Sequence, residues 1–330
     1  MLIATIDAGT TNTRTRIWQG STVVGEAHAA VGVRNTAIDG NNHQLLSAIH
    51  TTLVEAAQQA GVAGAGIELI LAAGMLTSNV GIVEIPHVAA PVTMEELAAA
   101  MVERTVPAIS AAPIWFVPGI KNLPDQAVQA DTISAMDIMR GEETEMAGLL
   151  AQLSPQGPAV IVLPGSHNKY ISLDGKQRVL GCMTTLTGEL LHSLTLDTIL
   201  ASSVQRGFAS CFDAEAFTRG VHYRENSGLS HAAFMARILD LFEHYTAEQA
   251  QNYLLGILLE DDLLSLQGSH IFNGLDQAHF IIAGKTVMQQ AYAALFGAHG
   301  WNVQLVGPEQ QQNLSGLGAI SLAKKRGLVH

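Results

Sequence analysis

The sequence has 330 residues, of which 48% are hydrophobic and 14% charged, and its formal net charge is −12. This length is enough for a large hydrophobic core and exceeds the size at which single cores tend to divide into two domains. The negative charge repels phosphate backbones, which disfavours nucleic-acid binding without sequence specificity, and no apolar run of about 18 residues predicts a membrane-spanning helix.

The amino terminus and the cysteines indicate the cellular compartment in which the protein is expected. Residues 1–7 (MLIATID) contain neither a basic segment nor a cleavage site of small residues, so they predict a strand rather than a signal peptide. The two cysteines, Cys182 and Cys211, are too few for a disulfide framework and form no metal-type CxxC pair. We therefore expect reduced thiols and a cytoplasmic protein.

The first half of the chain predicts a meander of strands, followed by alternating helices and strands. Apolar or alternating runs separated by turn residues indicate three strands, at residues 2–6, 13–18 and 22–28. A helix over residues 42–60 follows, because Leu45, Ile49 and Leu53 recur at helical spacing. The remaining segments indicate a strand at 67–72, a helix at 95–104, a strand at 114–117 and a helix at 141–153.

The second half repeats this outline without detectable residue identity. It predicts strands at 159–163, 169–173 and 177–184, helices at 188–203 and within 230–266, a strand at 279–283, a helix at 286–296, a strand at 303–306 and a helix at 316–325. The segment 154–158 (SPQGP) is a natural break between the halves. We expect an α/β fold with domains at 1–155 and 156–330.

The turn after the first strand contains small and hydroxyl residues. Gly9 allows the backbone to approach an anion, and Thr10, Thr11 and Asn12 add side-chain donors beside their main-chain N–H groups. Asp7 ends a buried strand, where a carboxylate is costly unless it holds a cation such as Mg²⁺, directly or through water. An ordinary hairpin with a polar tip is the alternative, but the position between two strands favours a phosphate site.

An equivalent turn follows the first strand of the second half. Gly165 and Ser166 repeat the combination of a small and a hydroxyl residue, His167 and Asn168 complete the turn, and Lys169 adds a positive charge. Two such hairpins would hold a triphosphate from both sides.

Several segments resemble known families. Residues 7–14 (DAGTTNTR) resemble the phosphate-1 hairpin of the actin–hexokinase–Hsp70 superfamily. Together with Gly74-Met75, the segments 139–144 (MRGEET), 163–169 (LPGSHNK) and 187–190 (TGEL) resemble the 2-dehydro-3-deoxygalactonokinase family, and this resemblance runs from residue 2 to about residue 322. It implies two ribonuclease-H-like (actin-like ATPase) domains with a cleft between them.

The resemblance also implies a function and a set of ligands. The family phosphorylates the 6-hydroxyl of 2-dehydro-3-deoxy-D-galactonate with ATP and Mg²⁺, in galactonate breakdown. By this resemblance the hairpins 9–12 and 165–169 would hold ATP phosphates, and Gly284, within 281–285 (IIAGK), would lie on the adenosine side. Residues 76–79 (LTSN) depart from the Gly-Ser-Arg type of run associated with the family, which affects the expected substrate contacts there.

Transfer to a hydroxyl requires an acceptor for its proton, and four carboxylates are candidates: Asp131, Asp137, Glu142 and Glu143. Acidic residues at 142, 143 and 145 also suit a helix N-terminus because of its dipole. Asp137 lies among apolar residues, where an unpaired carboxylate is costly. We therefore rank Asp137 first as the base and Glu142 second.

An anionic substrate requires a fixed cation, and an arginine guanidinium matches a carboxylate with two parallel hydrogen bonds. Arg140 lies next to the expected base, and Arg14 and Arg16 follow the first hairpin and share one face of their strand. A surface ion pair is the alternative for each of them.

Other functions remain open on the same fold, including a pantothenate kinase or another sugar kinase. A nucleotide-switched sugar sensor is a further alternative, but the first motif starts at Asp7 and leaves no room for a preceding DNA-binding module. The thirteen histidines form no HExxH motif, which disfavours a zinc hydrolase. We expect ATP and a sugar acid as partners, with no nucleic acid and no membrane, and a homodimer is one option for the assembly.

Overall fold

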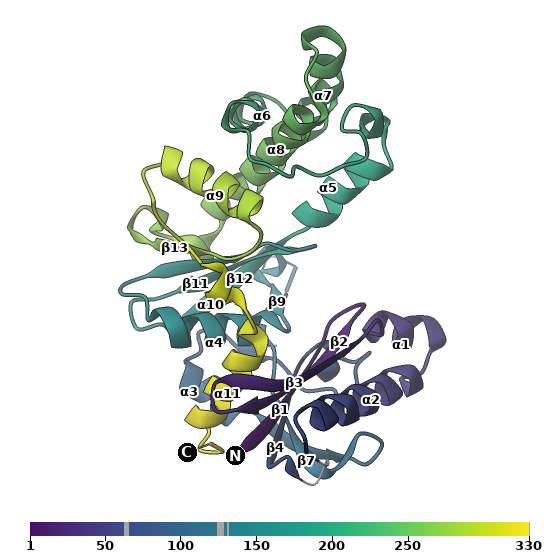
Figure 1. Ribbon diagram of the computed structural model, residues 1–330. Coiled ribbons are helices and arrows are strands. Elements are labelled where there is room, and N and C mark those ends of the chain that lie inside the picture. The colour runs from purple at the N-terminus through teal and green to yellow at the C-terminus, as the bar shows by residue number, and fades with distance from the viewer. Residues whose placement is uncertain (63–65, 124–128, 131, 330) are drawn as a thin grey trace. The chain divides into compact units, whose positions relative to one another are not determined.

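The computed structural model describes residues 1–62, 66–123, 129–130 and 132–329. The chain forms two compact units (Figure 1). The first comprises Met1–Pro155, Gln177–Gly181 and Glu309–His330, and the second comprises Gln156–Lys176 and Cys182–Pro308. None of the described helices is long and apolar enough to cross a membrane.

The first unit is built on a six-stranded sheet with the order β3-β2-β1-β4-β7-β6. Its strands are β1 (Leu2–Ala8), β2 (Thr13–Gln19), β3 (Thr22–Ala29), β4 (Leu69–Gly74), β6 (Val102–Val106) and β7 (Ser110–Phe116). Strands β1, β2 and β3 form the predicted antiparallel meander, and β4 pairs with the free side of β1 in parallel. The ends of β1 and β4 therefore meet at one edge of the sheet.

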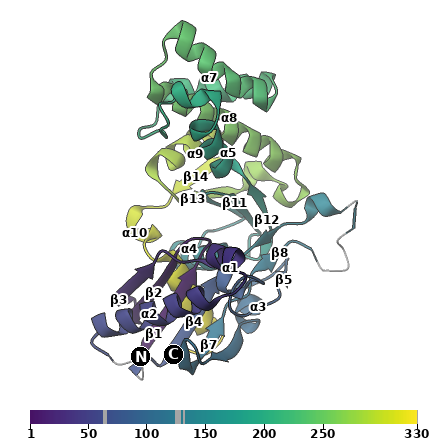
Figure 2. The same cartoon turned by 90° about the vertical axis from the view of Figure 1, so that its right-hand side faces the viewer.

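Helices cover both faces of this sheet (Figures 1 and 2). Helices α1 (Val33–Asp39) and α2 (His43–Gln59) lie on one face, where Leu45 and Ile49 pack with Ala4 and Ile6 of β1. The side chains that alternate with these point to the other face, so Asp7 lies opposite Arg14 of β2 on the side of α11 (Leu314–Lys325). This alternation directs Asp7 away from the hydrophobic cluster on the side of α1 and α2.

Small residues allow α11 to pack closely against other elements of the first unit. A Cβ on Gly318 would lie 1.7 Å from the carbonyl oxygen of Thr144 in α4 (Glu142–Leu153), and one on Gly316 would lie 2.5 Å from Trp18. Only glycine permits this approach of two helices. As a result, residues 309–330 belong to the first compact unit, whereas the sequence placed them in the second domain.

A three-stranded sheet with the order β5-β8-β9 completes the first unit. It consists of β5 (Val88–Ala89), β8 (Ile120–Lys121) and β9 (Ile138–Met139). These strands were not predicted, because two residues are too few to show the alternation of apolar and polar residues that marks a strand. The predicted helix at 95–104 was also too long. Helix α3 (Met94–Ala99) ends before β6, in which the β-branched residues Val102 and Val106 favour a strand.

The second unit repeats the strand order of the first. Its five-stranded sheet has the order β12-β11-β10-β13-β14, with β10 (Ala159–Leu163), β11 (Asn168–Leu173), β12 (Val179–Thr185), β13 (His279–Ile282) and β14 (Asn302–Leu305). As in the first unit, the first strand of the meander pairs in parallel with a later strand. This duplication confirms the predicted fold class.

The long helices of the second unit are α5 (Thr187–Leu196), α6 (Ala214–Asn226), α7 (Leu229–Glu243), α8 (Ala247–Gly268) and α9 (Thr286–Ala298). The short α10 (Pro308–Gln311) begins at the last residue of this unit, and its other residues belong to the first unit. The predicted helix at 188–203 ends at Leu196 and continues only as a 3₁₀ turn at Ile199–Ser202. Helix α6 was missed, although Asp213 caps it by accepting from the backbone N–H of Ala216.

Candidate functional site

The first hairpin has an exposed tip at residues 9–12. The carbonyl oxygens of Gly9 and Thr10 accept hydrogen bonds from the backbone N–H groups of Val33 and Arg34, at 3.2 and 2.9 Å. Among the described residues, no group of the chain accepts from the backbone N–H groups of residues 10–12. Because Val33 and Arg34 already donate to the carbonyl oxygens of Gly9 and Thr10, the hairpin presents N–H donors at its tip, where an anion can bind.

Asp7 lies at the end of β1, directly before this hairpin. Burial raises the pKa of its carboxyl, while a hydrogen bond with Ser315 lowers it. Gly74 of β4, which pairs with Ala8 in the parallel register, has φ of +76°, and a Cβ there would lie 2.7 Å from Asp7 Oδ1. Glycine at this position leaves space beside the carboxylate.

The N-terminus of α4 brings further acids to the same edge. Glu142 Oε2 accepts from the backbone N–H of Arg140 at 3.0 Å, and the negative charges of Glu142 and Asp7 act on each other. Burial and these two charges raise the pKa of Glu145 to about 7. The structure therefore places Glu142 in one acidic cluster with Asp7.

Glu143 is fully buried at the start of α4. Its Oε2 accepts from the backbone N–H of Gly141 at 2.7 Å, whereas its buried Oε1 has no hydrogen-bond partner among the described residues. Burial, with the charge of Glu142, raises the pKa of Glu143 to about 8. At neutral pH this side chain is therefore mostly uncharged.

Arg140 is a half-buried cation held by uncharged acceptors. Its guanidinium donates to Thr77 Oγ1, to the carbonyl of Ile85 at 2.9 Å and to His87 Nδ1 at 3.2 Å. Since arginine only donates, His87 Nδ1 accepts, and burial together with the charge of Arg140 lowers the pKa of His87 to about 4. Within the described residues no carboxylate oxygen lies within 4.0 Å of Arg140.

The other predicted acids and arginines of this unit lie as follows. Asp137 precedes β9, and its Oδ1 accepts from the backbone N–H of Ile138 at 2.7 Å. Arg14 and Arg16 share a face as predicted, and both pair with Glu26, at 3.4 and 3.0 Å. Asp131 lies outside the described residues.

The second hairpin differs from the first because part of it points inward. Gly165, Ser166 and His167 are exposed, but Asn168 and Lys169 are buried. Asn168 Oδ1 accepts from the backbone N–H of Gly165 at 3.2 Å, and Lys169 Nζ donates to Thr184 Oγ1. The side chain of Asn168, predicted to hold phosphate, is thus bonded within the unit and supports the hairpin from below.

Helix α5 begins against this hairpin. The backbone N–H of Glu189 donates to the carbonyl of Ser166 at 3.0 Å, and the Glu189 carboxylate lies 2.9 Å from His167 Nε2. A Cβ on Gly188 would lie 2.1 Å from the carbonyl oxygen of Gly165. The close packing places the positive end of the α5 dipole beside the exposed hairpin residues.

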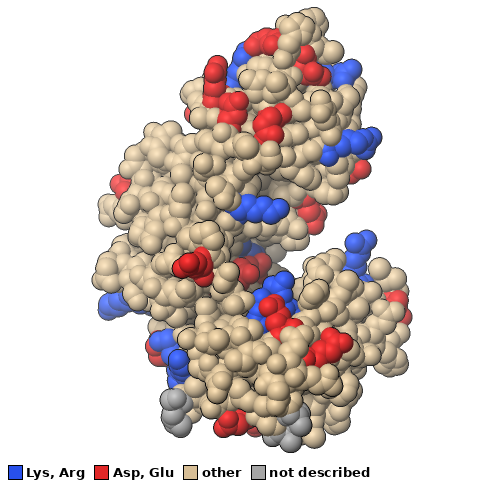
Figure 3. Space-filling view, viewed as in Figure 1, with Lys and Arg blue, Asp and Glu red and all other residues tan. Residues whose placement is uncertain are grey.

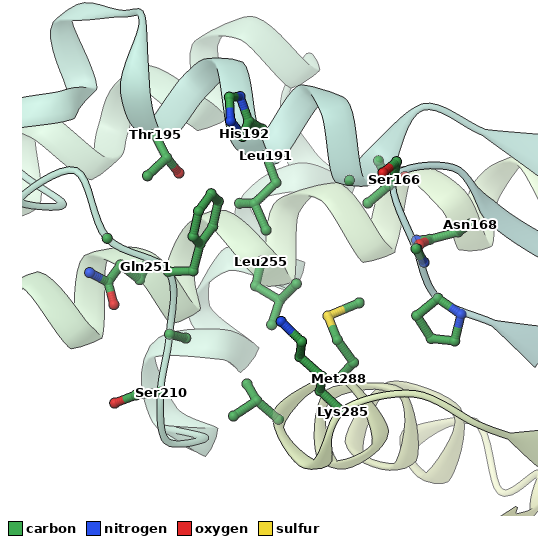
Figure 4. Close-up of a pocket in the computed structure, with 18 of the residues that line it drawn as sticks. Ser166, Asn168, Leu191, His192, Thr195, Ser210, Gln251, Leu255, Lys285 and Met288 are labelled. Carbon is green, nitrogen blue, oxygen red and sulfur yellow. The ribbon is translucent and has the colours of Figure 1, made fainter. Parts of the chain in front are cut away.

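A pocket of about 690 Å³ opens next to this junction. Its walls come from the hairpin residues 164–166 and 168, the start of α5, the loop 207–210, Gln251 and Leu255 of α8, and residues 285–288 at the start of α9. Figure 4 shows Leu191 and Leu255 near the middle of the pocket, Ser166 and Asn168 at one end, and Ser210 and Gln251 at the other. Two helix N-termini and an apolar middle suit a nucleotide.

Only part of this pocket is predictable from the sequence. Gly284 has φ of +98°, and a Cβ there would lie 3.1 Å from the ring of Pro164, so it shapes the turn that leads to Lys285. The loop 207–210 and the residues of α8 were missed. Their only signal was Gly207-Phe208 between predicted helices, which is typical of many loops.

The carboxylates of the acidic cluster are chemically suited to bind Mg²⁺. Within the described ranges, no group of three or more His, Cys, Asp or Glu side chains could hold a metal ion. Mg²⁺ usually keeps several waters and takes only one or two carboxylates, with substrate phosphates as further ligands. Asp7 and its acidic neighbours fit such a partial site, since a cation would reduce their mutual repulsion.

Figure 3 shows the charged side chains on one face of the molecule. On this face, several Lys or Arg side chains of the described residues lie beside Asp or Glu side chains, and they form no extended basic patch.

Comparisons with known proteins identify relatives along nearly the whole chain. The 2-keto-3-deoxy-galactonokinase family matches residues 7–320. The Rhizobium meliloti (strain 1021) protein named probable 2-dehydro-3-deoxygalactonokinase DgoK1 is 28% identical over 323 residues, which cover 97% of this chain and 96% of that protein.

Solved structures agree with this assignment. A crystal structure of a Sinorhizobium meliloti protein assigned to 2-dehydro-3-deoxygalactonokinase has a TM-score of 0.74 and 25% identity and covers 98% of both chains. Component A of the (R)-2-hydroxyglutaryl-CoA dehydratase of Acidaminococcus fermentans has a TM-score of 0.50 and 10% identity, covers 98% of this chain and 99% of its own, and shares the fold alone. With its duplicated actin-like ATPase architecture, the chain belongs to the 2-keto-3-deoxy-galactonokinase family.

Proposed function

We propose that this protein transfers the γ-phosphoryl group of ATP to the 6-hydroxyl of 2-dehydro-3-deoxy-D-galactonate. As a member of its family the chain is a kinase, a phosphotransferase with an alcohol group as acceptor, and it uses ATP. One observation supports the sugar acid in particular. Arg140 is a half-buried cation whose hydrogen-bond partners among the described residues, Thr77, the Ile85 carbonyl and His87, are uncharged.

Arg140 suits the carboxylate of the substrate. Thr77, the Ile85 carbonyl and His87 fix the plane of the guanidinium, and they leave part of its five donors for a ligand. The low pKa of His87 keeps that ring neutral, so it does not repel the arginine at working pH. A fixed planar donor of this kind favours an acid over a neutral sugar.

ATP is assigned to the pocket of the second unit. The apolar side chains of Leu191, Leu255 and Met288 would contact the adenine ring, and the exposed hairpin residues with the start of α5 would hold phosphate oxygens. Lys285 adds a cation at the start of α9. Gly9, Thr10, Thr11 and Asn12 are proposed as the phosphate contacts of the first unit.

Asp7 is proposed to hold Mg²⁺, and Glu142 is proposed to accept the proton of the substrate hydroxyl. Mg²⁺ would be held by Asp7 through water, and when bound it would neutralise charge on the phosphate oxygens. Glu142 is our preferred proton acceptor, because it shares the acidic cluster of Asp7 and α4 holds it in place. Asp137, ranked first from the sequence, is the alternative, and its Oδ1 accepts from the next backbone N–H.

A coupled assay for ADP release tests this function directly. Purified protein is incubated with ATP, Mg²⁺ and a panel containing 2-dehydro-3-deoxy-D-galactonate, its C4 epimer, a neutral sugar of equal length and pantothenate. Fastest turnover with the galactonate derivative is expected. Turnover with pantothenate instead would replace the proposal by another kinase of this fold, and ATP binding without any turnover would favour a sensor. Use of ATP also supports the cytoplasmic location that we propose.

A further inference from the structure

One buried carboxylate of the second unit collects hydrogen bonds from several elements. Asp262 of α8 is 4% exposed. Its Oδ2 accepts from Asn168 Nδ2 at 3.0 Å, Tyr170 Oη at 2.7 Å and Thr185 Oγ1 at 3.0 Å, and its Oδ1 accepts from Thr187 Oγ1 at 2.6 Å. All four partners are uncharged side chains.

The directions of the hydrogen bonds in this cluster converge on Asp262. Asn168 Nδ2 also donates to Tyr292 Oη at 2.8 Å. Tyr170 gives its only proton to Asp262, so across the 2.7 Å contact between the two tyrosines Tyr292 donates to Tyr170. Both amide protons of Asn168 and both phenol protons thus have fixed acceptors. The donors around residue 262 therefore need a side chain that accepts hydrogen bonds on both of its terminal atoms, and a carboxylate does so.

The partners of Asp262 belong to the elements that form the pocket. Asn168 ends the second hairpin and, through Oδ1, holds the backbone N–H of Gly165. Thr187 is the first residue of α5, and Gly165, Asn168 and Thr187 all line the pocket. Tyr292 lies on α9, whose first residues form another wall. Asp262 therefore bonds directly to two walls of the pocket and reaches the third through Asn168 and Tyr170, without lining the pocket itself.

We propose that Asp262 is a positioning residue for nucleotide binding: it fixes the second hairpin and the N-terminus of α5 at the separation that the phosphates require. This inference rests on the assignment of ATP to the pocket under the proposed function. Preorganised donors need not be ordered when the ligand binds, and this raises affinity. Without the carboxylate, four donors would compete for fewer acceptors, and the hairpin would lose its fixed place relative to α5.

The substitution Asp262→Asn tests the proposal with little change in volume. An amide accepts on one atom only, so at least one present donor loses its acceptor. We expect the KM for ATP and the dissociation constant of a fluorescent ATP analogue to rise by roughly tenfold or more, the usual effect of one lost hydrogen bond to a charged group. The KM for the sugar acid should stay within about twofold, since the residue acts through the nucleotide pocket.

A pair of tyrosine variants supplies the matched control. Tyr292→Phe removes a buried hydroxyl from the cluster, whereas Tyr253→Phe removes a buried hydroxyl of the same unit that donates to the carbonyl of Ala232 at 3.1 Å. Both should lower the melting temperature slightly, and only Tyr292→Phe should weaken binding of the ATP analogue. This pair keeps the test valid if Asp262→Asn fails to fold.

Two results would overturn the proposal. One is wild-type affinity for the ATP analogue in both Asp262→Asn and Tyr292→Phe, and the other is equal weakening by Tyr292→Phe and Tyr253→Phe. The binding measurement does not depend on the acceptor substrate. A protein that binds the analogue normally but phosphorylates no sugar acid would refute the proposed function and leave the role of Asp262 intact.

Discussion

Glu143 should make the stability of the protein fall with rising pH. Its pKa is raised from 4.5 to about 8, chiefly by burial. Between these values the folded state binds the proton and the unfolded state does not, so the free energy of unfolding decreases as pH increases. At about 1.36 kcal/mol per pH unit, the raised pKa corresponds to about 5 kcal/mol between pH 4.5 and 8.

The variant Glu143→Gln should remove this contribution. Glutamine has nearly the same volume, keeps an oxygen that accepts from the Gly141 N–H, and carries no charge at any pH. We expect wild type and variant to have similar stability near pH 4.5. The variant should become progressively more stable than wild type toward pH 8, by several kcal/mol.

Urea unfolding at four pH values from 5 to 8 measures this difference directly. Asp7 and Glu145 also have raised pKa values, so the difference between variant and wild type is the informative quantity. Glu55→Gln, on the exposed side of α2, is the control and should follow the wild-type curve. Parallel pH profiles for wild type and Glu143→Gln would show that Glu143 ionises normally, and the argument from its burial would fail.

The other predictions concern turnover. Asp7→Asn should leave the fold intact and remove most Mg²⁺-dependent turnover, and a near-normal kcat would exclude a role on the metal side. Arg140→Lys keeps the charge but loses the planar fork, so the KM for the sugar acid should rise selectively, while an equal rise in the KM for ATP would place the arginine elsewhere. Glu142→Gln should lower kcat by about 10² or more with little change in the KM for ATP, whereas the same loss in Asp137→Asn alone would make Asp137 the base.

The repeated strand pattern was predictable because it depends on local signals. Strands β1 to β3 and β10 to β12 are short apolar or alternating runs between turn residues, and a shift of one residue would expose their core side chains. The C-terminal segment could not be assigned in this way. Its place in the first unit depends on Gly316 and Gly318, whose contacts join residues far apart in sequence.

For the candidate site, the sequence could group residues that belong to one motif, but it could not show which residues far apart in the chain lie in contact. The motif at 139–144 singled out Arg140, whose role stays a prediction, and nothing in the sequence connected it with Thr77 or His87. Similarly, Asn168 looked like a phosphate ligand because it follows a glycine turn. Its inward direction depends on Asp262, which lies 94 residues further along the chain.

Arg140, the proposed contact of the anionic substrate, is a positive charge in a protein whose net charge is −12. Glu143, whose charge acts on Arg140, has a pKa of about 8 and is mostly protonated at neutral pH. A carboxylate with an ordinary pKa in this place would neutralise the arginine and compete with the substrate. The burial of Glu143 therefore reduces the negative charge beside Arg140, although the charge of Glu84 also acts on the guanidinium. His87 likewise accepts from Arg140 without adding negative charge, because its pKa of about 4 leaves the ring neutral at working pH.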